Sequence, residues 1–126
     1  MSDDNEGVTL YEAAGGMPFF ERLVARFYDG ITADPVLRPM YPEDDMAGAQ
    51  RRLTLFLGQY WGGPTTYMEE RGHPRLRARH MPFPIGPGER DRWLLYMATA
   101  VEELTEPGEI RDMLMGYFVP AAEIGR

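Results

Sequence analysis

The stretch from Arg71 to Met97 reads RGHPRLRARHMPFPIGPGERDRWLLYM and carries the most informative residues of the chain. It holds both histidines of the protein, His73 and His80, among closely spaced arginines. Pro74 suits the first position of a helix, and Pro82 would end that helix just after His80. The pattern predicts an imidazole at the end of a short helix, with guanidinium groups beside it and a rigid loop after it.

Two kinds of interpretation are open for this stretch. Haem iron takes an axial histidine, and arginine pairs well with the haem propionates. A lone histidine, however, is more often a solvated or hydrogen-bonded side chain than a metal ligand. The arginines equally fit a solvated face, or a docking patch for nucleic acid or an acidic partner. The residues of this stretch alone do not decide between them.

Composition limits the possible classes of protein. The chain has 126 residues, 44% of them hydrophobic, so we expect one domain over residues 1–126, with residues 1–8 as a disordered tail. A net charge of −7 argues against general nucleic-acid binding. No membrane span and no signal peptide is recognisable, so a cytoplasmic protein is expected. Without cysteine there is no disulfide, no thiolate metal site and no thioether-attached haem.

Apolar residues recur at helical spacing, and no segment alternates like a strand, which predicts an all-α protein. Helices are expected at 18–32, 44–60, 74–80, 89–104 and 109–119, with at most a short helix at 9–14. Residues 65–72 are expected as a connector with about one helical turn. Four of these helices should each bury one apolar face. The first long helix should bury Phe19, Phe20, Leu23, Val24, Phe27, Tyr28 and Ile31. The next should bury Met46, Ala49, Leu53, Phe56, Leu57 and Tyr60, with Thr54 off that face. The helix at 89–104 should bury Trp93, Leu94, Met97, Ala98, Val101 and Leu104, and the last should bury Ile110, Met113, Leu114, Tyr117 and Phe118.

Two local features should mark helix ends. Glu43, Asp44 and Asp45 are expected as caps and dipole partners of the helix that they open, rather than as metal ligands. Pro120 is expected to kink or end the last helix, because proline cannot donate a backbone hydrogen bond.

Several ordered blocks of the chain resemble a truncated haemoglobin of group II, the O-type of the bacterial globin family. The similarity runs from about Tyr11 to Tyr117 and includes RFYDGI from Arg26, FLGQYWGGP from Phe56 and RGHPRLRARHMPF from Arg71. This resemblance implies a two-over-two helical sandwich, in which the helices at 18–32 and 44–60 cross those at 89–104 and 109–119. Non-covalent haem b would lie between the two pairs.

The resemblance also implies roles for individual residues. His80 matches the proximal ligand of the iron, and Tyr28, Tyr41 and Trp93 match the polar residues of the distal pocket. Ala49 takes the place where many globins keep a distal histidine. The remaining residues expected at the haem are the wall residues Leu53, Phe56, Leu57 and Phe83, and the candidates for the propionates Arg52, Tyr67, Arg77 and Arg79, with Arg79 and Tyr67 as first choices.

The function implied by the resemblance is reversible binding of O2, and of other small ligands such as CO, NO, cyanide and sulfide, as in an oxygen-binding or oxygen-transport globin. The alternative is a haem oxidoreductase, an NO dioxygenase or peroxidase-like enzyme, fed by a partner reductase. The pocket has no distal histidine–arginine pair for splitting peroxide, but its tyrosines and tryptophan are oxidisable. Whether the protein is an enzyme, and whether it is a monomer or a homodimer, stays open at this point.

Overall fold

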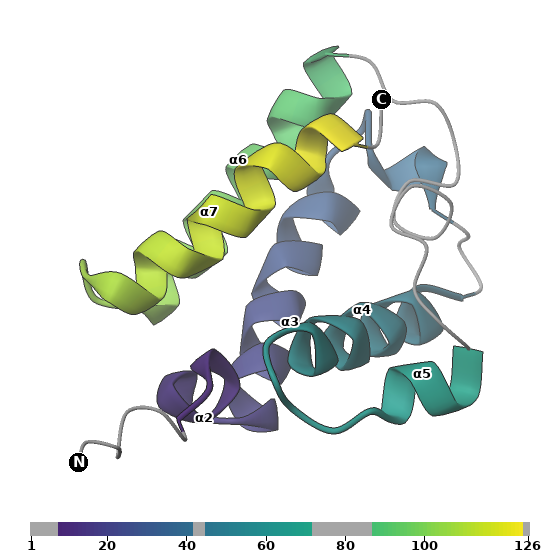
Figure 1. The fold of residues 1–126 in the computed structure, drawn as a ribbon. Coiled ribbons are helices and arrows are strands. Elements are labelled where there is room, and N and C mark those ends of the chain that lie inside the picture. Colours follow the sequence, from purple (N-terminus) through teal and green to yellow (C-terminus); the bar gives the residue numbers. More distant parts are fainter. Residues whose placement is uncertain (1–7, 42–44, 72–86, 125–126) are drawn as a thin grey trace.

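A computed structural model describes residues 8–41, 45–71 and 87–124, and within these ranges every regular element is helical (Figure 1). The helix expected at 74–80 lies outside the described residues. The connector after Pro64 contains a helix of its own. In chain order the elements are α2 (Leu10–Ala14), α3 (Met17–Ala33), η1 (Arg38–Met40), α4 (Met46–Tyr60), α5 (Thr66–Arg71), α6 (Pro87–Leu104) and α7 (Glu109–Ile124).

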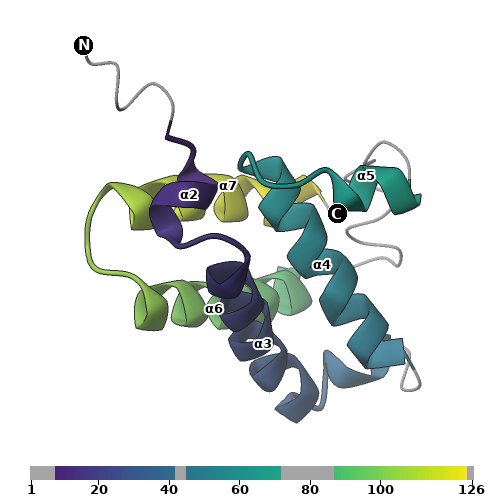
Figure 2. The same ribbon diagram turned by 90° about the horizontal axis from the view of Figure 1, so that it is seen from below.

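The four long helices form two crossed pairs. Helix α3 packs against both α4 and α6, and α6 packs against α7. Figures 1 and 2 show α6 and α7 side by side in opposite directions, with α3 between them and α4. This arrangement is the predicted two-over-two sandwich. No helix in the described ranges is long and apolar enough to cross a membrane.

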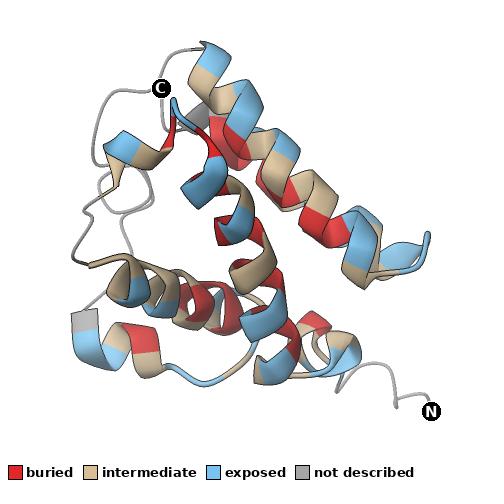
Figure 3. Ribbon diagram, turned by 180° about the vertical axis from the view of Figure 1, so that it is seen from behind, coloured by how far each residue is buried: buried red, intermediate tan, exposed pale blue. Residues whose placement is uncertain are grey.

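Helix α3 is the central element because its apolar stripe is buried along its whole length. Every residue of the predicted stripe, from Phe19 to Ile31, is buried, and Figure 3 shows the corresponding band on α3. Pro18 stands in the first turn, where its missing N–H removes no hydrogen bond. Since each fully buried large apolar side chain contributes about 1.5–3 kcal/mol, this stripe accounts for much of the core.

The predicted face of α4 was wrong at two positions. Thr54 is buried, and its hydroxyl donates to the carbonyl of Gln50 at 2.9 Å, so a polar side chain is accommodated in the core. Tyr60 is exposed, at 51% of its surface, although its ring packs against Trp61 and Tyr117.

The predictions for the last helix also need correction. Helix α7 does not end at Pro120 but continues to Ile124. Ala121 and Ala122 are both buried, so tertiary packing holds the turn that Pro120 weakens. Met113, expected in the core, is exposed, because the buried face runs instead through Leu114, Phe118, Ala121 and Ala122.

Candidate functional site

Tyr28 projects from α3 and is buried next to Tyr41. Burial raises the pKa of Tyr28 well above its ordinary value; Tyr41 adds to this rise and Arg52 opposes it. The phenol therefore keeps its proton at neutral pH and remains a donor.

Tyr41 lies one residue after η1, where the backbone turns extended with φ −112° and ψ 143°. Its ring stands edge-on to that of Tyr28, with centroids 5.7 Å apart and an interplanar angle of 80°. Burial raises the pKa of Tyr41 to about 12, and a hydrogen bond from the Trp93 side chain opposes part of that rise. Indole nitrogen is a donor only, so Trp93 donates and the Tyr41 hydroxyl accepts.

Trp93 on α6 lies next to Tyr41, and its side chain is 3% exposed. Its ring meets Phe27 edge-on at a centroid distance of 5.3 Å, and Phe118 of α7 at 6.4 Å. These contacts hold the indole between the two helix pairs. The structure thus brings together Tyr28, Tyr41 and Trp93, which are far apart in the sequence.

Several further residues predicted at the haem come from α4 and α5: the wall residues from α4, and the propionate candidate Tyr67 from α5. Phe56 and Leu57 are buried, while Ala49 and Leu53 are partly buried and pack against the core. Tyr67 on α5 is also buried, with its ring edge-on to Phe56 at 5.3 Å. These side chains all belong to the hydrophobic core or pack against it.

The first turn of α4 differs from the sequence prediction. Asp45 occupies the N-cap position, yet its side chain makes no capping hydrogen bond. Instead its Oδ2 accepts a hydrogen bond from Nη2 of Arg52 at 2.7 Å. Arg52, a candidate for a haem propionate, therefore has an acidic partner on its own helix. Glu43 and Asp44 lie outside the described residues.

The remaining predicted site residues lie outside the described residues: His80, Phe83, Arg77 and Arg79. His73 lies outside them as well. The described residues of the site provide hydrogen-bond donors beside buried apolar side chains. This donor set fits the distal side of a haem whose ligand carries negative charge.

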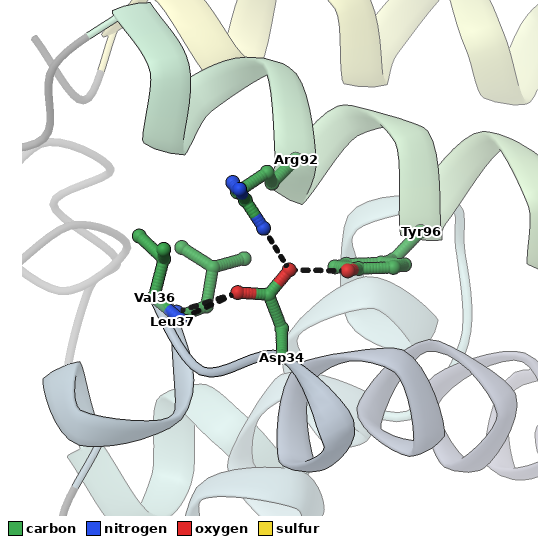
Figure 4. Close-up of polar contacts among 5 residues, drawn as sticks. All are labelled: Asp34, Val36, Leu37, Arg92 and Tyr96. Atoms are coloured by element: carbon green, nitrogen blue, oxygen red, sulfur yellow. Dashed lines mark hydrogen bonds and ion pairs between the residues drawn. The ribbon is translucent and has the colours of Figure 1, made fainter.

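A polar cluster that includes Arg92, the neighbour of Trp93 in the sequence, was not predicted from the sequence (Figure 4). Asp34, at the end of α3, is buried and accepts hydrogen bonds from Arg92 and Tyr96 of α6. The local sequence predicts only that Asp34 and Pro35 begin a turn or a short helix that ends near Met40. The sequence did contain one signal for this cluster, an aspartate directly after a fully apolar stripe. A carboxylate buried at such a position requires hydrogen-bond or ion-pair partners.

Fold and site together define a class: an all-α, two-over-two globin in which Tyr28, Tyr41 and Trp93 lie together. A family model for bacterial-like globins matches residues 9–123, and the chain belongs to this family. Membership of the globin family implies haem binding.

Individual relatives agree with this assignment. The chain is 44% identical over 106 residues to the group 2 truncated hemoglobin YjbI of Bacillus subtilis, covering 84% of this chain and 79% of that protein. The solved structure of a thermostable hemoglobin from Thermobifida fusca matches with 57% identity and a TM-score of 0.89, over 94% of this chain and 98% of that one. The truncated oxygen-avid haemoglobin of Bacillus subtilis matches with 41% identity and a TM-score of 0.83, again over 94% and 98%.

Proposed function

We propose that this chain, as a single domain, binds haem b non-covalently through His80 and binds O2 reversibly, with Tyr28, Tyr41 and Trp93 as hydrogen-bond donors. The observation that carries the proposal is the convergence of these three polar aromatic side chains from α3, the segment after η1 and α6. Family membership supports the haem, and similarity to the oxygen-avid haemoglobin of Bacillus subtilis supports O2 as the ligand.

The residues that would hold the haem have distinct roles. His80 would bind the iron through Nε2, leaving Nδ1–H for a backbone carbonyl. Arg79 and Tyr67 are the first candidates for the propionates, followed by Arg77 and by Arg52, which already pairs with Asp45. The apolar faces of the ring would contact Ala49, Leu53, Phe56, Leu57 and Phe83.

The distal donors explain how the ligand would be retained. When bound, haem supplies a ferrous iron that binds O2 with negative charge on the outer oxygen atom. A hydrogen bond to a charged group contributes about 1.5–3 kcal/mol, and about 1.4 kcal/mol corresponds to a factor of ten. One donor such as Tyr28 would therefore slow ligand release by about 10- to 100-fold.

The contact between Trp93 and Tyr41 adds to this effect. A hydroxyl that accepts a hydrogen bond becomes a better donor, because hydrogen bonds in a chain polarise one another. Donation from Trp93 to Tyr41 would strengthen donation from Tyr41 to the ligand. Slow release suits storage, sensing or redox chemistry better than simple transport. CO, NO, cyanide and sulfide are further ligands of such a pocket.

The haem proposal is tested by absorption spectra of the protein expressed with haem, in the ferric, reduced and oxygenated states. The wild-type protein should show a Soret band that shifts on reduction and again on oxygenation. His80→Ala should lose or grossly change this band, whereas His73→Ala, the matched control, should keep it. A well-folded wild-type protein that takes up no haem would contradict the proposal.

A second candidate function, a haem oxidoreductase, is favoured by one specific observation. Oxidisable and aromatic rings connect the pocket to the surface: Trp93 contacts Phe118 at 6.4 Å, Phe118 contacts Trp61 at 5.8 Å, and Trp61 contacts the exposed Tyr60 at 5.0 Å. Such a series would suit electron exchange with a partner reductase. Turnover of NO or peroxide with an electron donor, well above that of free haem, would favour this function; turnover at the free-haem level would exclude it.

A further inference from the structure

The carboxylate of Asp34 joins the end of α3 to α6 (Figure 4). Its Oδ2 accepts hydrogen bonds from Nη1 of Arg92 at 2.7 Å and from the hydroxyl of Tyr96. Arg92 immediately precedes Trp93 in α6, and Tyr96 follows it by less than one helical turn. Asp34 therefore holds α6 at two points, one on each side of Trp93.

The other oxygen of the same carboxylate organises the segment that leads to Tyr41. Oδ1 of Asp34 accepts from the backbone N–H of Val36 at 2.7 Å and of Leu37 at 3.0 Å. These two bonds fix the turn after α3, and η1 and then Tyr41 follow directly from it. One side chain thus contacts both segments that supply the hydrogen bond between Trp93 and Tyr41.

Close packing next to Asp34 fixes α6 further. Gly30 lies one helical turn before Asp34 in α3, and a Cβ atom at Gly30 would lie 2.6 Å from Cγ of Tyr96. The Tyr96 ring therefore rests directly on the α3 backbone, with its hydroxyl on Asp34. Small rotations of α6 about its axis would break either the ring contact or the hydrogen bond.

The carboxylate keeps its charge in this environment. Burial by itself would raise the pKa of Asp34, but hydrogen bonds from Tyr96, from the Leu37 N–H, from Arg92 and from the Val36 N–H outweigh it and hold that pKa well below its usual range. The contact to Arg92 is therefore an ion pair at neutral pH.

We propose that Asp34 is a positioning residue for the distal donors: through Arg92 and Tyr96 it sets the position of Trp93, and through the turn after α3 it sets that of Tyr41. This inference rests on the function proposed above. If Asp34 only stabilised the fold, its replacement would change only the free energy of unfolding. If Asp34 positions the donors, its replacement also changes the hydrogen bonding to the bound ligand.

The experiment compares Asp34→Asn with Glu103→Gln in the ferrous, CO-loaded protein. Glu103 is the matched control because it pairs with Arg26 at 2.7 and 3.0 Å and also joins α3 to α6. It lies about 15 Å further along α6 than Trp93, from the rise per helical residue. The readouts are the CO stretching frequency, the 15N–1H signal of the Trp93 indole and the rate of O2 dissociation.

Asp34→Asn should shift the CO frequency and the indole signal, and should speed O2 release about tenfold, the effect of weakening one hydrogen bond to the ligand. Glu103→Gln should leave all three at wild-type values. The proposal is overturned if Asp34→Asn is less stable but keeps the wild-type CO frequency, indole signal and O2 dissociation rate. It is also overturned if Glu103→Gln shifts these three readouts equally.

The proposal can also be tested if Asp34→Asn does not fold or if the wild-type protein takes up no haem. If Asp34→Asn does not fold, Tyr96→Phe removes only one hydroxyl and should shift the indole signal in a stable protein; an unchanged signal overturns the proposal. If the wild-type protein takes up no haem, the proposed function fails. The Trp93 signal of the haem-free protein, assigned with Trp61→Phe, still tests the positioning: it should move in Asp34→Asn and not in Glu103→Gln.

Discussion

Trp93 on α6 donates a hydrogen bond to the hydroxyl of Tyr41, the residue that follows η1. The bond links α6 to the segment between α3 and α4. Because Tyr41 also stands edge-on to Tyr28, a change at Trp93 is expected to reach the whole donor set.

Replacing Trp93 by phenylalanine should release O2 about 10- to 100-fold faster, since a donor to Tyr41 or to the ligand is lost. The same change should raise the pKa of Tyr41 further, because the hydrogen bond that opposes its rise is gone. Stopped-flow O2 dissociation and ultraviolet titration of the tyrosines measure the two effects. Trp61→Phe is the control, and equal rates in both variants would contradict the prediction.

Replacing Tyr28 by phenylalanine tests the buried donor that α3 supplies. The ring packing against Tyr41 is retained, so the fold should be kept while O2 dissociation rises by about 10- to 100-fold. Tyr60→Phe removes the same hydroxyl from an exposed position. A Tyr28→Phe protein with the O2 dissociation rate of Tyr60→Phe would show that Tyr28 does not contact the ligand.

Local periodicity was enough to predict the four long helices of the fold. The stripe of α3 is buried at every predicted position, because a helix that packs on two neighbours exposes little of its apolar face. The same rule failed at Met113 and Pro120, since the burial of Ala121 and Ala122 decides where α7 lies and ends.

The site could be predicted only in part. Tyr28, Tyr41 and Trp93 come from separate segments, and no local pattern shows that they meet; family resemblance supplied that prediction. Asp34 was missed because its partners, Arg92 and Tyr96, are distant in sequence, and Arg92 was interpreted as part of a basic cluster. Asp45 was expected to cap α4, but a charged neighbour, Arg52, competes for its carboxylate.

The stability that Asp34 provides should depend on pH. Its pKa is lowered on folding, so the contribution is fully present above the unfolded value of about 3.9 and is lost as pH falls toward the folded value. Asp34→Asn should be less stable than wild type by about 1–3 kcal/mol at pH 7, where buried donors lose a charged acceptor. Urea unfolding of both proteins at pH 7 and at about pH 3 should show the gap narrowing in acid; a gap that stays constant would contradict the linkage.

Replacing either of two helical glycines by alanine should change the free energy of unfolding, but in opposite directions. Glycine to alanine in a helix normally stabilises by about 0.5–1 kcal/mol. At Gly116 nothing lies within 4 Å of the new Cβ, so Gly116→Ala should show this gain. At Gly30 the Cβ would meet the Tyr96 ring, so Gly30→Ala should destabilise by about 1–3 kcal/mol. Thermal unfolding of both variants provides the comparison, and stabilisation by Gly30→Ala would show that the ring moves away freely.

The hydroxyl of Tyr117 should be dispensable. Among the described residues it is the one buried side-chain polar atom that has no hydrogen-bond partner. Burial, with a further contribution from Tyr60, raises the pKa of Tyr117, so the buried group is the neutral phenol. Removing an unsatisfied buried hydroxyl also removes its desolvation cost, so Tyr117→Phe should be neutral or more stable by up to about 1 kcal/mol. The ring contacts to Tyr60 and Trp61 would be kept. Tyr117→Leu, which loses the ring contacts, should destabilise in the same urea titration. A clear loss of stability in Tyr117→Phe would instead show that the hydroxyl has a partner, such as a buried water molecule.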